Sequence, residues 1–344
     1  MSAPLTVGFH TRVPFASGQA GEALRDGIRL FQHGEQLGFD RGWVYQRHFD
    51  NYLASPLVFL PVVAQHTERI GLGTAIIGIR YEDPVLLAEA ASTADHLTGG
   101  RLQLGLSTGQ GGFDAAFGQE ANDGREQSQR RLATFLRGIR GEAVGEGVSF
   151  DGTPLDEPLT VRGASPALLE RVWYGGGSIA SAERIGSQGL RLMLSTILTG
   201  DIHDYNAEQL AAIRAYRAAH VGPRPPRVVV SRSILPATTP ELARLYAAYD
   251  QERRTQGPAA SRPQGAVAPG AVAARRGENP RPMTMSPAIH GEPARIVDTL
   301  LADVALAEAD ELIAFLPPAF GPDENARLLE DIATHVIPAL VAAR

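Results

Sequence analysis

The strongest constraint on the fold is an alternation along the whole chain between short runs rich in aliphatic residues and longer segments with helical spacing of apolar residues. Strands are expected at 5–11, 41–46, 69–79, 101–109, 171–178, 190–196, 226–235 and 310–317. Helices are expected at 22–37, 57–66, 83–100, 125–140, 179–186, 205–219, 240–250, 293–307 and 325–341. Eight strands, each followed by helix, predict an α/β fold of the (β/α)8 TIM-barrel type. An open doubly wound sheet is the alternative, but residues 8–18 lack the GxGxxG turn that it would place after the first strand.

The length of 344 residues suits one such barrel, so we expect a single domain over 1–344. Two segments interrupt the alternation: residues 141–170, after the fourth strand and its helix, and residues 252–288, after the seventh strand. The second is dense in Pro, Gly, Ala and Arg and has no apolar period. It is interpreted either as a mobile loop or lid over the site or as a flexible insertion.

Composition excludes several classes of function. The net charge of −6 offers nothing to attract nucleic acid, and no window reaches the roughly 18 apolar residues of a membrane helix. The N-terminus has no signal-peptide pattern, so the cytoplasm is the default location. There are no cysteines, and the nine histidines form no HExxH motif, so no metal site is expected.

A barrel builds its site at the carboxyl ends of its strands, so the polar residues there are the candidates. They are His10, Thr11, Gln46, Arg47, His48, Thr74, Ser107, Thr108, Gly109, Gly175, Gly176, Gly177, Ser178, Ser195, Thr196, Ser231 and Arg232. The set contains no carboxylate pair for glycoside hydrolysis and no GxSxG nucleophile. Neutral hydrogen-bonding groups with one or two imidazoles suit an organic cofactor that brings its own chemistry.

The segment Gly175–Ser178 is the clearest cofactor signal. Three glycines follow a strand and a serine precedes a helix, so backbone N–H groups and the positive end of the helix can meet a phosphate. The alternative is a Gly-rich turn in which Ser178 only caps the helix. Arg125, at the start of the fourth helix, is a candidate counter-charge, and its alternative is a solvated surface arginine.

Four blocks of the chain, in order, resemble the bacterial luciferase-like flavin monooxygenases. They are "LGFDRGWVYQRHF" (37–49), the long block from "RIGLGTAIIGI" to "LSTG" (69–109), "VWYGGGSIASAERIG" (172–186) and "IHGEPARIVDTLLADVALAEADELIAF" (289–315). The resemblance implies a barrel that binds reduced FMN and activates molecular oxygen.

The resemblance also implies where the flavin lies. The third strand would bulge beneath it, with a non-proline cis peptide at Ala75–Ile76, next to Thr74. Ser107 would be the small residue under the flavin, followed by Thr108 and Gly109. The family often has a phosphate-binding arginine after this position, and this chain has Thr108 instead. Arg125 and the glycine segment would then have to hold the phosphate.

The triplet Gln46-Arg47-His48 departs from the Glu-His-His of the luciferases themselves. An arginine stays protonated and cannot act as a general base near neutral pH, so aldehyde oxidation with light emission is not the reaction that we expect. His48 is a candidate catalytic residue or, alternatively, a core histidine. Arg47 is a candidate to bind a substrate oxygen or the negative charge of the reduced flavin, or else forms a salt bridge at the barrel mouth.

The sequence therefore predicts an FMN-dependent monooxygenase that hydroxylates or epoxidises a mid-sized organic substrate, for example in the biosynthesis of an antibiotic or another natural product. Candidate substrate-binding residues are His10, Gln46, Phe113 and Thr196. Aromatic residues expected at the mouth are Phe9, Phe15, Phe49, Tyr52 and Phe113.

Two partners are expected: a separate flavin reductase and a second copy of the chain. The homodimer would form through Leu57, Phe59, Leu60 and Val63, which could equally be ordinary packing residues. The alternatives for the function are a deazaflavin-dependent hydride-transfer enzyme, a non-catalytic flavin-binding relative and a barrel enzyme without flavin.

Overall fold

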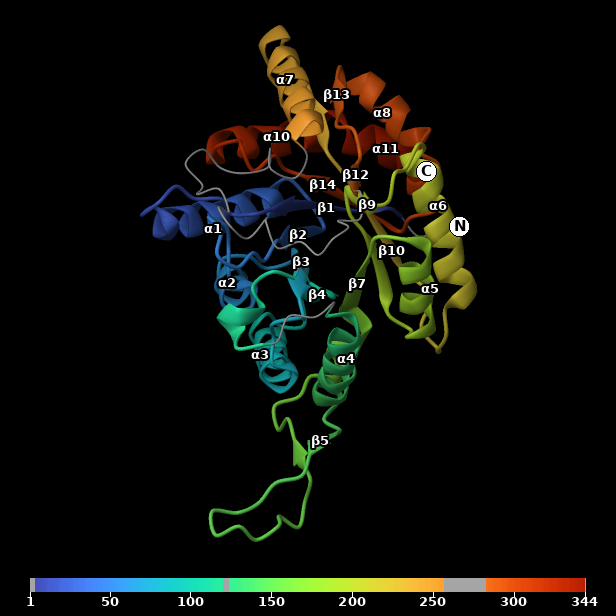
Figure 1. The fold of residues 1–344 in the computed structure, drawn as a ribbon. Helices are drawn as coiled ribbons and strands as arrows, with labels where there is room; N and C mark the ends of the chain where they lie inside the picture. The colour runs from blue at the N-terminus through green and yellow to red at the C-terminus, as the bar shows by residue number, and fades with distance from the viewer. Residues whose placement is uncertain (1–3, 110, 120–123, 257–282, 344) are drawn as a thin grey trace.

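The computed structural model describes residues 4–109, 111–119, 124–256 and 283–343. Eight parallel strands form a closed barrel in the order β1-β14-β10-β8-β7-β4-β3-β2 (Figure 1). Their bounds are β1 Thr6–Thr11, β2 Arg41–Val44, β3 Gly71–Gly78, β4 Leu102–Ser107, β7 Val172–Gly176, β8 Arg191–Leu194, β10 Val228–Arg232 and β14 Glu311–Phe315. The predicted (β/α)8 barrel is confirmed.

Helices surround the barrel and follow the strands in the predicted order (Figure 1). They are α1 Ala20–Gln36, α2 Pro56–Ala64, α3 Pro84–Leu97, α4 Arg125–Arg140, α5 Ile179–Ser187, α6 Tyr205–Ala219, α7 Pro240–Gln256, α8 Pro293–Leu301, α9 Val304–Ala307, α10 Pro322–His335 and α11 Ile337–Ala342. Within the described ranges, no helix combines the length and the apolar character that crossing a membrane requires.

The barrel interior is filled by large side chains packed against small ones. Trp43 and Trp173 meet edge to face with ring centroids 5.9 Å apart, and Met193, Val229 and Ile313 complete the cluster. Glycine on the neighbouring strands provides the space for these rings: a Cβ at Gly8 would lie 3.1 Å from Nε1 of Trp43. The outer faces of the strands pack against the helices in a separate, larger core.

Charged side chains close the amino-terminal end of the barrel. The buried carboxylate of Glu311 accepts hydrogen bonds from Arg41 and, at 3.1 Å, from Arg227. The guanidinium groups of Arg41 and Arg191 lie over the ring of Trp173, 5.8 and 5.1 Å from its centroid. Burial lowers the pKa of Arg191 to about 10, although the nearby Glu311 raises it. We refer to these residues as the barrel floor.

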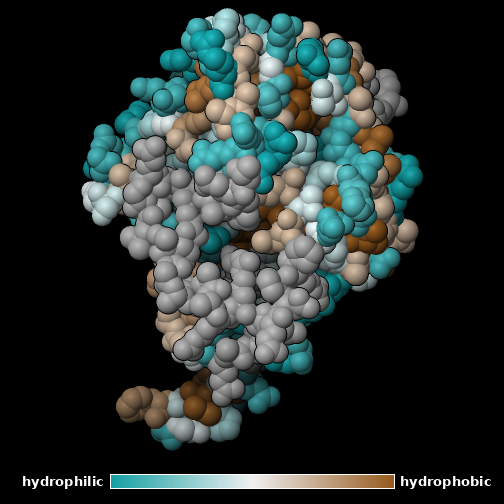
Figure 2. All heavy atoms as spheres, turned by 45° about the horizontal axis from the view of Figure 1, so that its top comes forward, coloured by the Kyte–Doolittle hydropathy of each residue, from teal (hydrophilic) through white to brown (hydrophobic). Residues whose placement is uncertain are grey.

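Both predicted insertions are present. Residues 141–170 contain the short strands β5 Ala143–Gly145 and β6 Leu159–Thr160 and the 3-10 helix η2 Pro166–Arg171, and β5 lies on an arm that projects away from the barrel (Figure 1). Figure 2 shows hydrophobic residues at the end of this arm. Its exposed apolar residues are Val148, Phe150, Leu155 and Leu159.

The second insertion begins and ends differently from the prediction. Residues 252–256 continue helix α7, and residues 283–285 form strand β12 (Met283–Met285), which pairs with β9 (Ile197–Thr199). Regular secondary structure therefore reaches into the predicted loop or lid at 252–288 from both ends. The rest of that prediction, 257–282, lies outside the described residues. Strands β11 (Ile234–Pro236) and β13 (Ile289–Gly291) pair with each other.

Two predicted helices are each divided in two. Residues 293–307 form α8 and α9, because the side chain of Asp303 accepts hydrogen bonds from the N–H groups of Ala305 and Leu306 and starts a new helix. Residues 322–342 form α10 and α11, and Pro338 stands in the first turn of α11. Proline has no N–H to donate to a preceding turn, so it favours this division.

Candidate functional site

The centre of the site is a bulge in strand β3. The pairing of β3 with β4 shifts register between Thr74 and Ile77, and the peptide bond between Ala75 and Ile76 is cis, as the resemblance implied. The hydroxyl of Thr74 donates to the carbonyl of Gly105 at 2.8 Å and accepts from its N–H at 2.9 Å, so it replaces the interrupted ladder. Thr74 is fully buried and holds the bulge, whereas Ala75 and Ile76 remain half-buried above the interior cluster.

Glycines on the adjacent strands leave room beside this bulge. A Cβ at Gly175 would lie 2.8 Å from Cδ1 of Ile76 and 3.6 Å from Cβ of Ser107. Ala75, Ile76 and Ser107 therefore border a region with small side chains at the carboxyl end of β3, β4 and β7, and we call these three residues the shelf. Such a surface can accept a flat ring system.

His10 lies beneath the shelf. Its Nε2 is 3.1 Å from the carbonyl oxygen of Ala75, and its ring stacks on Phe315 with centroids 4.9 Å apart. Burial, with a smaller contribution from the positive charge of Arg12, lowers the pKa of His10 to about 3. The imidazole is therefore neutral, and Nε2 carries the proton that the carbonyl accepts. Its Nδ1 is buried and, among the described residues, has no hydrogen-bond partner.

The predicted triplet follows β2 and its side chains have different neighbours. Gln46 donates to Glu82 at 2.9 Å and accepts from the N–H of Gly78 at 3.3 Å, which fixes the end of β3. Arg47 lies 3.6 Å from Asp50 and donates to the hydroxyl of Tyr45 at 3.4 Å. The salt-bridge alternative for Arg47 is thus what the structure shows, and a substrate contact remains a prediction.

His48 is surrounded by aromatic rings from three loops. Phe117 lies 4.9 Å and Tyr81 6.1 Å from it between centroids, and Phe49 and Phe113 complete the group. Burial lowers the pKa of His48, and the charge of Glu82 opposes this change only partly. We call these five residues the aromatic cluster. They form an apolar side of the mouth on which Phe49 remains exposed.

Phe9 is not at the mouth. Its side chain points away from the barrel interior and is fully buried between Phe31 and Phe39, with ring centroids 5.2 and 5.6 Å apart. The alternation of a strand explains the error: His10 faces the interior, so its neighbour Phe9 must face the helices.

The end of β4 is tied to α4 and β7. The Oγ of Ser107 accepts from the N–H of Gly109 at 3.2 Å, and the carbonyl of Thr108 accepts from Ser128 at 3.1 Å. The hydroxyl of Thr108 is 3.4 Å from that of Tyr174, whose pKa burial raises. A group of hydroxyls therefore stands at the rim between β4 and β7.

The glycine segment already binds an oxygen atom. The N–H groups of Gly177 and Ser178 both donate to the hydroxyl of Ser181, at 3.1 and 3.0 Å. The hydroxyl of Ser178 in turn accepts from the N–H of Ser181, which makes a capping box at the start of α5. Ser178 therefore caps the helix, and a phosphate contact of the glycine segment stays a prediction. The same two N–H groups converge on one point, which is the geometry that an anionic oxygen requires.

Arg184 is a further candidate that the sequence analysis did not name. It lies in the second turn of α5, and its charge partly opposes the rise that burial causes in the pKa of Tyr174. Its Nε is buried without a partner in the described part of the chain. Arg125 is exposed at the first position of α4. The signal for Arg184 was its place in the helix that follows the glycine segment, seven residues after Gly177.

An ion pair holds the loop after β4 in place. Arg80 and Asp114 are both largely buried, and Nη2 of Arg80 lies 2.6 Å from Oδ1 of Asp114. Burial raises the pKa of Asp114, but hydrogen bonds from Arg80 and the N–H of Gly112, together with the charge of Arg80, keep the pKa below its usual value. Phe113 is fixed through its N–H, which donates to the hydroxyl of Tyr81 at 3.0 Å.

Thr196 is buried just after β8, and its carbonyl accepts from the N–H of Ser286 at 2.9 Å. Arg232 points away from the mouth and pairs with Asp303 at 2.7 Å.

No group of three or more histidine or acidic side chains suited to a metal ion occurs in the described ranges.

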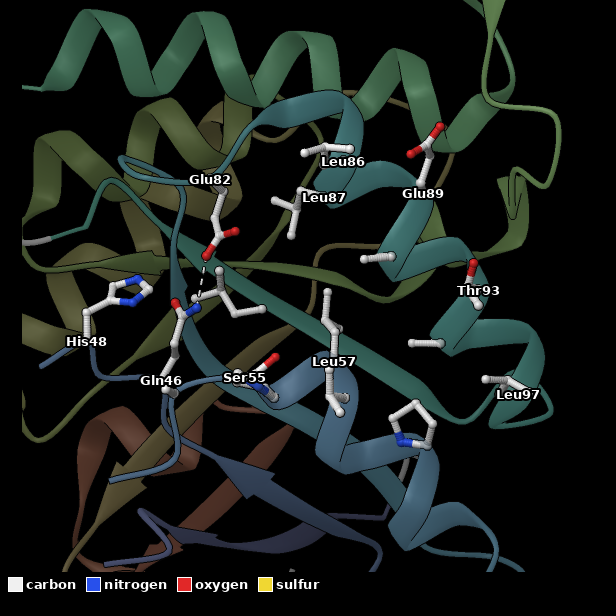
Figure 3. A pocket seen from close by; sticks show the side chains of 17 residues that line it. Gln46, His48, Ser55, Leu57, Glu82, Leu86, Leu87, Glu89, Thr93 and Leu97 are labelled. Carbon is white, nitrogen blue, oxygen red and sulfur yellow. Dashed lines mark hydrogen bonds between the residues drawn. The ribbon is translucent and has the colours of Figure 1, made fainter. Parts of the chain in front are cut away.

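A groove of about 640 Å³ runs between α2 and α3 and ends at Gln46 and His48 (Figure 3). Figure 3 shows the bonded side chains of Gln46 and Glu82 at this inner end. The apolar residues that line the groove include Leu57, Val58, Leu86 and Leu97.

Three of the residues expected at a dimer interface are instead packing residues, which was the alternative for them. Phe59, Leu60 and Val63 are buried in the core of the subunit, because they form the inner face of α2. The exposed apolar residues of this surface are Val58 and Val62 on α2 and Leu86 and Leu97 on α3.

Comparison with known proteins adds to this geometry. A family model described as luciferase-like monooxygenase matches residues 6–311. Limonene 1,2-monooxygenase from Rhodococcus erythropolis is 32% identical over 132 residues, which is 38% of this chain and 34% of that protein. An F420-dependent glucose-6-phosphate dehydrogenase from Kineococcus radiotolerans is 35% identical over 125 residues, 34% of this chain and 36% of that protein. The match spans about a third of the length of each relative.

The fold extends over the whole of a solved structure. The oxygenating constituent of 3,6-diketocamphane monooxygenase from Pseudomonas putida, a type II Baeyer-Villiger monooxygenase in complex with FMN, superposes with a TM-score of 0.68 at 14% identity. The superposition covers 98% of this chain and 99% of that one. At 14% identity, this similarity shows that the two proteins share the barrel fold.

Proposed function

Because the chain belongs to the luciferase-like monooxygenase family, we propose that it uses reduced FMN and molecular oxygen to hydroxylate or epoxidise a mid-sized organic substrate. A natural-product pathway, such as antibiotic biosynthesis, is the setting that we propose for this reaction. The observation that carries the cofactor assignment is the shelf next to an anion-binding loop: Ala75, Ile76 and Ser107 border a flat space, and the N–H groups of Gly177 and Ser178 converge on one oxygen nearby in the fold.

The described residues fit a flavin phosphate at the rim between β4 and β7. Gly175, Gly176 and Gly177 bring the backbone close, and the hydroxyl of Ser181 marks where a phosphate oxygen would sit. Ser178 and Thr108 add hydroxyl groups, and Arg184 supplies a positive charge from the same helix. We retain Arg125 as a second cation, with a smaller effect because an exposed charge is screened by water.

The residues of the chain have separable tasks around such a cofactor. Reduced FMN, when bound, supplies the electrons and the place at which oxygen reacts. His10 holds the Ala75 carbonyl through Nε2 and leaves Nδ1 as an acceptor, so it positions the shelf or a substrate hydroxyl. The aromatic cluster surrounds His48, and Gln46 fixes the end of β3. Arg47, with Phe113 and Thr196, borders the space left for substrate.

A deazaflavin-dependent hydride transfer is the second candidate. A relative with 35% identity over 125 residues is named as F420-dependent, so this cofactor has support as well. The two candidates differ in their use of oxygen: the monooxygenase consumes oxygen in turnover, whereas the hydride transfer does not. We prefer the FMN-dependent monooxygenase because the matching family model is described as luciferase-like monooxygenase.

Anaerobic titration with reduced FMN tests the cofactor. We expect saturable binding, and we expect Arg184→Gln to raise the Kd for reduced FMN about tenfold, since a charge-assisted hydrogen bond contributes roughly 1.5–3 kcal/mol. Reduced riboflavin, which lacks the phosphate, should bind the wild type and Arg184→Gln equally well. Arg125→Gln should change FMN affinity in the same direction by a smaller factor.

Arg130→Gln is the control, because Arg130 is exposed on α4 and pairs with Glu126. It should leave both affinities unchanged. Absence of reduced FMN binding at millimolar concentration would refute the proposal. An equal loss of FMN and riboflavin affinity in Arg184→Gln would remove Arg184 from the phosphate site.

We also propose a flavin reductase as a transient partner that supplies reduced FMN, and a homodimer that covers the groove between α2 and α3. The support for the dimer is the exposed apolar surface of Val58, Val62, Leu86 and Leu97. Light scattering should give about twice the chain mass of 36.7 kDa for the wild type. The double variant Val58→Glu, Leu86→Glu should be monomeric.

Val221→Glu serves as the matched control, since Val221 is an exposed valine in the loop after α6. It should remain dimeric. A monomeric wild type, or a dimeric double variant, would reject this interface.

A further inference from the structure

Arg253 is a buried cation that forms no ion pair with the described residues. It lies on α7, is 2% exposed, and donates through Nη1 to the carbonyl of Ser286. Its Nη2 is also buried and meets no acceptor in the described ranges. Asp250, one turn earlier on the helix, is bonded to Arg254 at 2.8 Å and to the N–H of Ala288 at 2.8 Å. Its charge raises the pKa of Arg253, but burial lowers that pKa more. A buried guanidinium with an unpartnered N–H group is costly, so such a site favours an anion.

A second guanidinium lies close to Arg253. Arg12 follows β1 and stands over three aromatic rings, 5.1 Å from the centroid of Tyr45, 5.3 Å from Tyr52 and 5.4 Å from Phe315. Burial lowers the pKa of Arg253, and the positive charge of Arg12 acts in the same direction, so the two cations are near enough to repel each other. An anion between them would relieve this repulsion.

Other polar atoms near Arg253 also lack partners. The hydroxyls of Ser286 and Ser233 and Oε1 of Gln209 are buried without a hydrogen bond in the described part of the chain. Backbone bonds bring their segments together: Ser286 donates through its N–H to Thr196, and the carbonyl of Ser233 accepts from Ile289. Native proteins leave few buried polar groups unsatisfied, so several in one region indicate a bound water or ligand.

These groups lie at the open end of the barrel. Ser233 follows β10, Thr196 follows β8 and Arg12 follows β1, so all three stand at the carboxyl ends of strands. The glycine segment proposed for the flavin phosphate follows β7. The two regions therefore follow different strands but lie at the same end of the barrel.

We propose that Arg253 anchors a subsite for a carboxylate of the organic substrate, with the hydroxyl groups of Ser286 and Ser233 as further donors. The assignment of this carboxylate to the substrate rests on the proposed monooxygenase function. A carboxylate presents two acceptor oxygens in a plane, which matches the free edge of a guanidinium with hydroxyl donors beside it. The rings around Arg12 suit an apolar or aromatic body next to that carboxylate.

A pair of probes that differ in charge tests the subsite. 2-Naphthoate and its neutral analogue 2-naphthamide would be titrated against the wild type, Arg253→Gln, Arg253→Lys and Arg244→Gln, with and without reduced FMN under anaerobic conditions. We expect the wild type to bind naphthoate at least tenfold more tightly than naphthamide. We call the Kd for naphthamide divided by the Kd for naphthoate the affinity ratio. Arg253→Gln should bring the affinity ratio near one, and Arg253→Lys should keep most of the preference for naphthoate. The exposed control Arg244→Gln should keep the full wild-type ratio.

The outcomes separate the subsite from the cofactor. A wild-type ratio near one, or a ratio that survives in Arg253→Gln, would overturn the subsite. Competition between naphthoate and reduced FMN would assign the anion to the cofactor and overturn the assignment to substrate. Independent binding of the two supports it. Failure of FMN binding with an intact, Arg253-dependent ratio would reject the monooxygenase and leave a carboxylate site.

Discussion

Replacing Gly105 with alanine should lower the free energy of unfolding by about 3 kcal/mol, at the upper end of the usual cost of overpacking. A Cβ at Gly105 would lie closer than 3.0 Å to the carbonyl oxygen of Thr74, which is backbone and cannot rotate away. The bulge of β3 would have to move, and with it Ala75 and Ile76. We therefore also expect Gly105→Ala to abolish binding of reduced FMN.

Urea unfolding and anaerobic flavin titration measure these two effects. Gly145→Ala is the matched control, because a Cβ at this exposed strand position has nothing within 4 Å. It should change neither stability nor flavin affinity appreciably. Wild-type flavin affinity in a destabilised Gly105→Ala protein would show that the shelf does not carry the flavin.

The second large effect concerns His10 and pH. The pKa of His10 falls from 6.5 to about 3 on folding, chiefly because burial disfavours the charged imidazole. Between these values the unfolded chain binds a proton that the folded protein does not, so stability falls as the pH decreases. At about 1.4 kcal/mol for each pH unit, this group alone should remove about 2 kcal/mol between pH 6.5 and pH 5.

Denaturant unfolding at pH 7, 6 and 5 checks the slope. The variant His10→Gln should lose about 2 kcal/mol less than the wild type over this range, whatever its stability at pH 7. His66→Gln changes an exposed histidine and should retain the wild-type slope. Parallel curves for wild type and His10→Gln would contradict a neutral, buried His10.

The barrel could be predicted because its signals are local. Helix α4 begins and ends at its predicted residues, since Gly124 and Gly141 flank it with positive φ. Helix α6 does so as well, with the side chain of Asp204 accepting from the N–H of Ala207 at its start. Strands were predicted a few residues too long, because β-prone residues continue beyond the last ladder bond, as Tyr45 does after β2.

The site was less predictable because its contacts join distant segments. Nothing local indicates that the amide of Gln46 bonds to Glu82, or that Arg253 donates to the carbonyl of Ser286. Arg184 and Arg253 look like ordinary helical arginines in the sequence. Only their burial, which depends on strands far along the chain, distinguishes them from solvated residues.

The triplet Gln46-Arg47-His48 illustrates both cases. Its place at the end of a barrel strand followed from the pattern, and the structure puts it there. The division of tasks did not follow: Gln46 fixes the end of β3, Arg47 pairs with Asp50, and His48 is enclosed by aromatic rings. Three residues that are adjacent in sequence therefore have different neighbours and different structural roles.

The barrel floor closes one end of the barrel, so only the end at the carboxyl termini of the strands is open. Glu311, held by Arg41 and Arg227, and the packed indoles of Trp43 and Trp173 fill the barrel axis at its amino-terminal end. Whatever is transformed at the shelf must then depart by the end through which it arrived. Substrate and product use the same opening, so a bound product delays binding of the next substrate. The rate of product release then limits the rate of turnover.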